Sequence, residues 1–356
     1  MKKTLNKTKI ADFATYIGVV IAFIVMNALM NEGLLTRSMK GQLVPICCYI
    51  VMAVSLNLTV GILGELSLGH AGFMSVGAFT GVVTAMSLQS AIPSDGVRLA
   101  LAIVMGAIFA GIAGTLVGIP VLRLHGDYLA IVTLAFGEII KELINCLIIG
   151  HDENGLHIIF NATGAKTVTD LGLTETGKVL IKGAQGAPGT DTIASFTAGF
   201  ILIMVTLVVV LNLARSRSGR AIMALRDNRI AAESVGINVT KYKLMAFVTS
   251  AALAGGAGAL YGLNFSNLVS SKFDFNTSIL ILVFVVLGGL GNMWGSIIAA
   301  AVLTVLPEAL RGFADYRMLI YAIVLIVVML ATNSPQMKAL LSKLVPFGKK
   351  GEKEHA

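Results

Sequence analysis

The sequence predicts an all-α integral membrane protein with about ten transmembrane helices. Of the 356 residues, 56% are hydrophobic and 13% are charged, whereas a soluble domain carries about 25% charged residues. A surface so poor in charge indicates that lipid is the solvent. The 38 glycines agree with this, because small residues let membrane helices approach one another closely. The length allows about ten spans of roughly 20 residues with short loops between them.

Apolar runs place ten candidate spans along the chain. The first run follows a Lys-rich N-terminal stretch and no cleavage site follows it, so we interpret it as an uncleaved anchor. Two stretches are not lipid-like: residues 150–192 are rich in Gly, Thr and charge, and residues 215–242 are short and basic. The spans lie near 13–31, 43–62, 71–90, 98–121, 128–149, 193–214, 243–265, 277–290, 295–311 and 317–333.

The distribution of Lys and Arg orients these spans. Ten spans place both termini on one side, and that side collects most of the 27 Lys and Arg residues, so the positive-inside rule makes it the cytoplasm. In one transmembrane domain, 1–356, residues 150–192 are then an external loop, 215–242 a cytoplasmic loop and 334–356 a cytoplasmic tail. Spans 2 and 7 cross in opposite directions, so units of spans 2–5 and 7–10 would be inverted repeats, a common transporter plan.

The stretch "GILGELSLGHAGFMSVGAFTG", Gly61–Gly81, joins spans 2 and 3 and places Glu65, Ser67 and His70 between glycines. One interpretation is a broken or re-entrant segment beside a transport path, with polar side chains facing the path. Non-helical backbone at membrane depth is tolerated only where protein buries it or where it lines a water-filled cavity. The other interpretation is a tight cytoplasmic turn with Glu65 near the lipid head groups.

Span 5 contains Glu138, Lys141 and Glu142. A charge at mid-bilayer costs roughly 3 kcal/mol or more, so these side chains should face protein or water. Glu138 and Lys141 are spaced i, i+3 and can neutralise each other at a helix–helix interface. The alternative is that Glu138 lines the path of a substrate.

Four G-x-x-x-G pairs predict close helix packing and carry no information about a substrate. The pairs are Gly77 with Gly81, Gly114 with Gly118, Gly258 with Gly262, and Gly291 with Gly295.

The basic stretch between spans 6 and 7 has the pattern of a short helix. Asp227 or Asn228 can cap its start and Gly236 can end it. Arg229 and Glu233 are spaced i, i+4 on one face. A helix of about two turns is not stable alone, so its own bundle, anionic lipid or a partner protein must hold it. A second, small-residue face, which suits a groove on another protein, contains Asn228, Ala231, Ala232 and Val235.

Four motifs together resemble the LivM-type permease of branched-chain amino acid ABC importers, from about Leu43 to Leu330. They are "GELSLGHAGFMSVGAF", "GDYLAIVTLAFGEIIKEL", "SRSGRAIMALRDNRIAAESVGINVTKYKLMAF" and "GGLGNMWGSIIAAAVLTVLPEALR". ABC importer permeases share a cytoplasmic E-A-A-x-x-x-G pattern that docks on the ATPase. Here both alanines and Gly236 are kept, and Ile230 stands in the place of the glutamate. The resemblance therefore implies a coupling helix, with ATPase contacts at Arg226, Asp227, Arg229, Ala231, Ala232, Glu233 and Gly236.

The resemblance also implies a transport subunit of the bacterial cytoplasmic membrane that is not itself an enzyme. Its partners would be a second, LivH-type permease, two ATPase subunits that bind ATP and magnesium, and an external substrate-binding protein. Candidate path residues are Glu65, Ser67, His70 and Glu138. The stretch Gly172–Val179 nearly fits a phosphate loop, but Val179 replaces the magnesium-binding hydroxyl, and the chain shows no metal-ligand spacing. Alternatives are a urea or short-chain amide permease of the same family and an ion-coupled secondary transporter.

Overall fold

The computed structural model describes residues 2–310 apart from 34–35, 125, 153–154, 162–167 and 173–176, together with 319, 322–323 and 326. The chain divides into two units, Met1–Ala301 and Val302–Ala356. In the second unit the described residues continue the last helix to Ala309. Every feature analysed below lies in the first unit.

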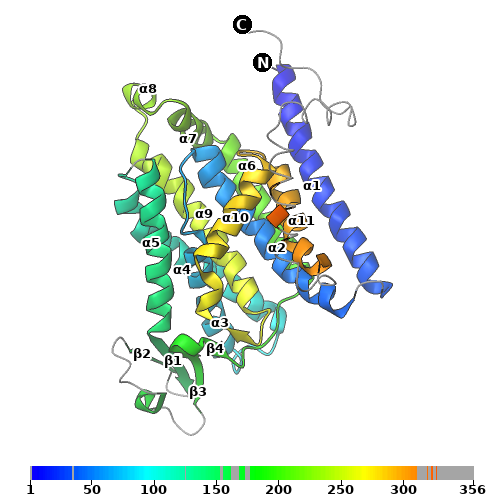
Figure 1. The fold of residues 1–356 in the computed structure, drawn as a ribbon, viewed down its shortest axis with the longest axis vertical. Helices are drawn as coiled ribbons and strands as arrows, with labels where there is room; N and C mark the ends of the chain where they lie inside the picture. Colours follow the sequence, from blue (N-terminus) through cyan, green and yellow to red (C-terminus); the bar gives the residue numbers. More distant parts are fainter. Residues whose placement is uncertain are drawn as a thin grey trace. The chain divides into compact units, whose positions relative to one another are not determined.

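Most of the described chain is helical (Figure 1). Polar side chains begin several of the helices: Thr36, Ser195 and Asp274 each accept a backbone hydrogen bond from the first turn that follows. The helices are α1 (Lys2–Asn31), α2 (Arg37–Asn57), α3 (His70–Ser87), α4 (Asp95–Val121), α5 (Asp127–Asn145), α6 (Phe196–Arg215), α7 (Arg217–Asp227), α8 (Arg229–Ser234), α9 (Val239–Gly262), α10 (Phe275–Gly288) and α11 (Met293–Ala309).

Helices suited to a membrane occur throughout the described residues. Five are long and apolar enough to cross one, namely the apolar part of α1, α2 with the π-helical segment that follows it to Leu63, α4, α6 and α9. The first nine predicted spans each overlap a helix, including the shorter α10 and α11. The tenth, 317–333, lies outside the described residues apart from four positions. The count of ten spans and the inverted repeat therefore stay predictions.

The centre of the first unit is built from α3, α4 and α9, which touch backbone to backbone. A β-carbon added to Gly77 would lie 2.0 Å from the carbonyl oxygen of Gly255, and one added to Gly258 would lie 2.0 Å from that of Met74. Such distances leave no room for a side chain, so glycine lets these helices approach. Similar close contacts surround Gly81, Gly114, Gly118 and Gly262.

The fourth G-x-x-x-G pair does not lie on one helix, so the expectation of helix packing is wrong for Gly291. Gly291 lies in the turn between α10 and α11 with a φ of +81°, a conformation that glycine adopts without strain. Gly295 is on α11 and packs against Gly288 of α10, whose carbonyl oxygen would lie 1.8 Å from an added β-carbon.

A small β structure corrects the all-α prediction, while the external position of residues 150–192 stays a prediction. Its sheet has the antiparallel order β2–β1–β3. The predicted span 128–149 is wrong at its end, because α5 stops at Asn145 and the apolar run Leu147–Ile149 enters β1. A short apolar run does not by itself distinguish a helix from a strand. The strands are β1 (Leu147–Asp152), β2 (Gly155–Phe160), β3 (Lys178–Lys182), β4 (Ala187–Pro188) and β5 (Asn267–Leu268), the last two forming a second pair.

Candidate functional site

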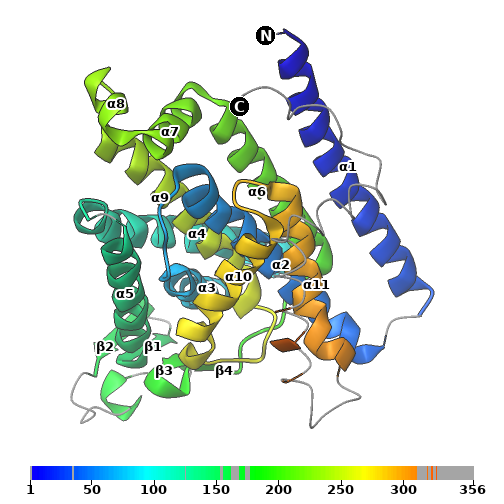
Figure 2. The ribbon, with the colours of Figure 1, turned by 45° about the horizontal axis from the view of Figure 1, so that its top comes forward.

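Helix α2 is not joined to α3 by a simple turn. It widens into a π-helical segment, η1 (Leu58–Leu63), and Gly64 then takes the left-handed conformation with a φ of +81°. Residues 64–69 are not helical, and α3 begins at His70. We call residues 58–69 the helix break. Figure 2 shows its extended part descending from the end of α2 to α3. The connection is therefore a broken segment rather than a tight turn.

The extended part of the helix break is held by α5, and the start of α3 that follows it is held by α10. The backbone N–H of Leu68 donates to Thr133 Oγ1 (3.1 Å), and that of Ala71 donates to Ser278 Oγ (3.2 Å). Gly69 approaches α5 so closely that a β-carbon there would lie 2.0 Å from the carbonyl oxygen of Thr133. Side-chain hydroxyls thus take the place of the helical partners that this backbone lacks.

The three candidate path residues in and directly after the helix break have different surroundings. His70 is buried, and its Nε2 lies 2.9 Å from Ser55 Oγ. Ser67 is also buried, and its hydroxyl has no hydrogen-bond partner among the described residues. Glu65 is largely buried and pairs with Lys243 of α9. His70 and Glu65 are therefore engaged with other parts of the chain, and their role in a path stays a prediction.

The basic stretch contains two helices where the sequence suggested one. Ser216 Oγ accepts from Gly219 N at the start of α7 (3.0 Å), and Asn228 Oδ1 accepts from Ala231 N at the start of α8 (3.0 Å). Gly236 follows α8 with a φ of +82°. Of the two predicted caps for the short helix, Asn228 is therefore the one that acts. These caps give residues 215–242 a defined shape.

The segment that contains α8 presents only part of the face predicted for it. Ala232 is only 4% exposed and packs inside the chain, whereas Ile230 and Val235 are 80% and 75% exposed. The predicted small-residue face is therefore wrong at Ala232, whereas Asn228, Ala231 and Val235 are exposed. The predicted i, i+4 pair is present, with Arg229 Nε 3.1 Å from Glu233 Oε1.

Two polar links join α7 and α9 to the helix break, and sequence reasoning found neither. Arg226 Nη1 of α7 donates to the carbonyl oxygen of Gly61 (2.9 Å), while its other nitrogens contact Asp227 Oδ1 at 3.2 and 3.3 Å. Lys243, which is 3% exposed, forms the ion pair with Glu65. Arg226 was expected to contact an ATPase, but its guanidinium is partly used within this chain. The sequence feature that could have identified Lys243 was its position as a charged residue at the start of an apolar span.

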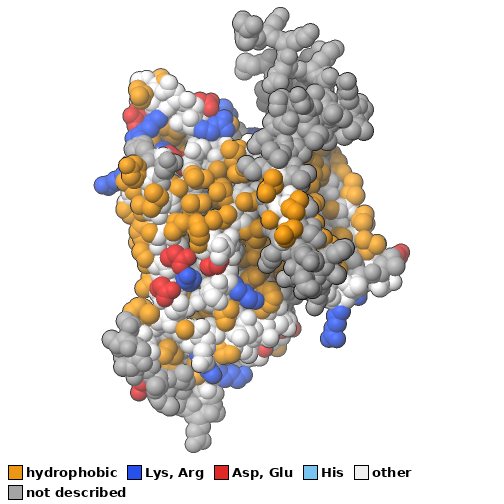
Figure 3. All heavy atoms as spheres, viewed as in Figure 1, with side chains coloured by type: hydrophobic (Ala, Val, Ile, Leu, Met, Phe, Trp, Pro, Cys, Tyr) orange, Lys and Arg blue, Asp and Glu red, His pale blue; other side chains and the backbone are white. Residues whose placement is uncertain are grey.

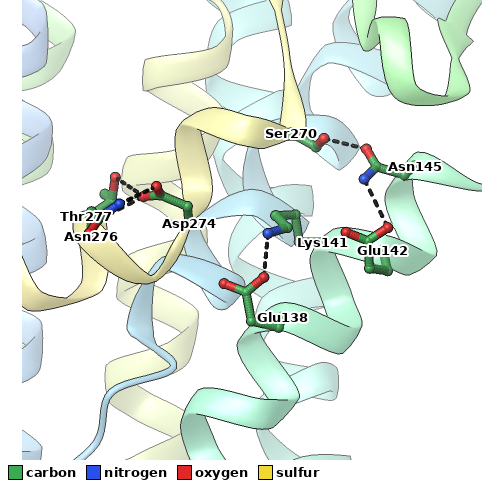
Figure 4. A network of polar contacts seen from close by, with 8 residues as sticks. All are labelled: Glu138, Lys141, Glu142, Asn145, Ser270, Asp274, Asn276 and Thr277. Carbon is green, nitrogen blue, oxygen red and sulfur yellow. Dashed lines mark hydrogen bonds and ion pairs between the residues drawn. The ribbon is translucent and has the colours of Figure 1, made fainter.

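A polar network covers part of α5 and the start of α10 (Figure 4). Lys141 forms the expected i, i+3 ion pair with Glu138. Asn145 Nδ2 donates to Glu142 Oε2 (3.2 Å), and Ser270 donates to Asn145 Oδ1. In the space-filling view, acidic and basic side chains interrupt a mainly hydrophobic face in the region of α5 and α10 (Figure 3).

Asp274 is the acidic member of this network at the start of α10. It accepts hydrogen bonds from Thr277 N (2.9 Å) and Asn276 Nδ2 (2.9 Å). Burial opposes its charge, but these hydrogen bonds and the charge of Lys141 outweigh burial and lower the pKa of the Asp274 carboxyl. The network therefore offers one ammonium group, that of Lys141, and three carboxylates, those of Glu138, Glu142 and Asp274.

The chain matches a family model described as "Branched-chain amino acid transport system / permease component" over residues 38–329. It is 35% identical over 292 residues to the high-affinity branched-chain amino acid transport system permease protein LivM of Escherichia coli (strain K12). That alignment covers 79% of this chain and 66% of LivM, just under two thirds of the relative's length.

More distant relatives include a second permease and a sugar importer. The LivH permease protein of the high-affinity branched-chain amino acid transport system of Salmonella typhimurium (strain LT2) is 22% identical over 289 residues, which is 79% of this chain and 88% of LivH. The fructose import permease protein FruG of Bifidobacterium longum (strain NCC 2705) is 28% identical over 142 residues, covering 37% of this chain and 42% of FruG. No solved structure matches the chain.

Proposed function

We propose, since the chain belongs to the branched-chain amino acid transport system permease family, that it is the membrane subunit of an ATP-driven importer of branched-chain amino acids. The importer would act in the cytoplasmic membrane of a bacterium. This chain would form the passage and would not hydrolyse ATP. Two separate ATPase subunits would bind ATP and magnesium.

The surface of α8 is the observation that carries this proposal beyond the family match. It exposes Ile230 and Val235 beside the ion pair of Arg229 with Glu233. The two charges of this pair cancel, so α8 itself attracts anionic lipid only weakly. Exposed apolar side chains with charged neighbours, presented on a capped segment, suit the groove of a soluble partner. We assign this surface to the ATPase.

The polar network on α5 and α10 supports a second permease subunit as the other partner. Charged side chains that face lipid are costly, so this face calls for a protein neighbour or water. The similarity to LivH over most of its length indicates that two permeases can share this fold. We propose that a related, LivH-type subunit covers the face and that the passage lies between the two subunits.

The same network suits the charged ends of an amino acid. An ammonium group would be attracted to Glu138 or Asp274, and a carboxylate to Lys141. The apolar surface around them would accept a branched side chain (Figure 3). Ser67 and His70 are buried and Glu65 largely so, whereas the Glu138 side chain is 37% exposed, so among the candidate path residues we place the main contact at Glu138.

The arrangement of the first unit supports placing the β1–β3 sheet and the α7–α8 segment on opposite sides of the membrane. The β1–β3 sheet and the α7–α8 segment lie at opposite ends of the bundle (Figure 1). We propose that α7, α8 and both termini face the cytoplasm, as the distribution of Lys and Arg predicts. The sheet would then face outward, where a substrate-binding protein delivers the amino acid.

The test is reconstitution of the complete transporter. The chain would be expressed with the ATPases, second permease and binding protein encoded beside it, and placed in vesicles with ATP on the ATPase side. We expect leucine uptake that requires both ATP and the binding protein. Urea uptake in place of leucine would indicate the amide permease. Uptake that follows an ion gradient without ATP would contradict the proposal in favour of a secondary transporter.

The assigned surface has its own test in the same complex. Ile230→Glu with Val235→Glu should abolish co-purification of the ATPase subunits, because two charges would enter an apolar contact. The matched control is Leu156→Glu with Ile158→Glu on β2, where both side chains are also exposed. This control should keep the ATPases. Retention of the ATPases by the α8 variant would contradict the assignment.

A further inference from the structure

We propose that Arg226 and Lys243 are positioning residues that connect the α7–α8 segment to the helix break, so that displacement of α8 changes the conformation of residues 58–69. The proposal rests on the proposed function, because it supplies the path by which an ATPase acting on α8 reaches the bundle.

Arg226 provides the first connection. The end of η1 leaves backbone carbonyl groups without helical partners, and the guanidinium of Arg226 binds one of them, at Gly61. The aliphatic part of the same side chain lies against Gly64, where an added β-carbon would be 2.5 Å from Arg226 Cγ. One side chain of α7 thus contacts both the last turn of the helix and the residue at which the backbone changes direction.

Lys243 provides the second connection. It lies in the first turns of α9, shortly after α8 and Gly236, and its ammonium group is buried against Glu65. A buried charge that loses its partner is strongly disfavoured, so the pair keeps Glu65 and Lys243 together when either element moves. Helix α8 is therefore flanked by two attachments to the helix break, one from Arg226 before it to Gly61 and the other from Lys243 after it to Glu65.

The opposite side of the helix break is anchored to the bundle. Asn57 Oδ1 accepts from Gly291 N (2.8 Å), and Asn57 Nδ2 donates to Ser296 Oγ (2.9 Å). Thr59 Oγ1 donates to Ser250 Oγ of α9 (2.9 Å). The start of η1 is thus fixed, while its end is held by α7, so movement of α7 would act on the turn between them.

The geometry of this turn suits a change of conformation. A π-helical segment has one more residue per hydrogen-bonded ring than an α-helix and often occurs at functional sites. Gly64 has no side chain to restrict its backbone. A small displacement of Arg226 can therefore change the backbone conformation at the end of η1 without disturbing the packed glycines of α3 and α9. The extended residues that follow reach Thr133 of α5, the helix that carries Glu138.

The experiment compares leucine uptake and ATP hydrolysis in the reconstituted transporter. Arg226→Met keeps most of the stem over Gly64 and removes the guanidinium. We expect uptake to fall about tenfold or more while ATP hydrolysis stays within about twofold. Arg123→Met, an exposed arginine in the α4–α5 connection, is the matched control and should leave both rates unchanged. Equal losses of uptake and hydrolysis, or no loss of uptake, would overturn the proposal.

The ion pair gives a second, independent readout. Glu65→Lys and Lys243→Glu should each reduce uptake per ATP hydrolysed, and the two changes together should restore at least half of it. Failure of the double variant to restore uptake, with an intact complex in gel filtration, would overturn the pairing. If a single variant does not assemble, the result for Arg226→Met decides whether the proposal stands. If the wild type shows no ATP-dependent uptake, the proposed function fails before any variant is compared.

Discussion

The packed centre of α3, α4 and α9 and the helix break are held by different physical means. In the centre, glycine lets backbones touch, and contact distances alone fix the geometry. In the helix break, side chains from α5, α7 and α9 bind backbone groups or a charged side chain. Packing of the first kind has essentially one arrangement, since close-packed interiors do not deform continuously. Polar links can exchange partners, so the comparison places rigidity in the centre and movement at the helix break.

The strongest test of this comparison is Gly258→Val in the packed centre. The added side chain would enter the 2.0 Å space beside the carbonyl oxygen of Met74. Overpacking of this kind should destabilise the protein by about 3 kcal/mol or more. Thermal unfolding in detergent, followed by gel filtration, measures the loss.

The matched control for that variant is Gly41→Val. Gly41 is exposed on α2 and has no neighbour within 4 Å of an added β-carbon, so its replacement should leave the unfolding temperature nearly unchanged or slightly raised. Equal unfolding temperatures for the two variants would show that the centre repacks freely, and the contrast with the helix break would be lost.

The next largest effect is expected from Gly64→Ala in the helix break, compared with Gly33→Ala. Both glycines have positive φ, +81° and +72°, so each alanine should cost about 1–2 kcal/mol of backbone strain. Only Gly64 also contacts Arg226, whereas Gly33 has no neighbour within 4 Å. We expect both variants to lose stability through backbone strain. Gly64→Ala should be less stable than Gly33→Ala by about 1 kcal/mol, because of its contact with Arg226.

Transport should separate these two glycine variants more clearly than stability does. Leucine uptake by the complete transporter should fall for Gly64→Ala and remain near wild type for Gly33→Ala. Loss of uptake in both variants would mean that backbone strain anywhere in the chain impairs transport. In that case the helix break would have no special role.

The sequence predicted the packed centre better than the helix break, for a physical reason. Apolar runs located the membrane helices, and the G-x-x-x-G spacing found the glycines of α3, α4 and α9, because both signals are local. The link between Arg226 and Gly61 joins residues 165 positions apart, and that between Lys243 and Glu65 joins residues 178 apart. No spacing rule connects such pairs.

Two further misses follow from the same limit. Leu147–Ile149 continues the apolar run of α5, and only pairing with β2 and β3 shows that it is a strand. Ala232 has the same side chain as Ala231, and only the packing of α8 shows that one is buried and the other exposed. Composition and periodicity describe a segment alone, whereas both outcomes depend on its neighbours.

The smallest effect on stability is expected at the polar network on α5 and at the start of α10, which belongs to neither region. Glu138→Gln keeps the shape and removes the charge that pairs with Lys141, whose side chain is 19% exposed. Stability should change by less than about 1 kcal/mol, because partly exposed ion pairs contribute little. If Glu138 binds the ammonium group of the amino acid, the KM for leucine uptake should rise about tenfold at an unchanged rate of ATP hydrolysis.

Glu32→Gln, at an exposed carboxylate after α1, is the control and should leave the KM unchanged. An unchanged KM for Glu138→Gln, with normal uptake, would make the network a purely structural contact between subunits. The passage would then have to use other residues of the two permeases.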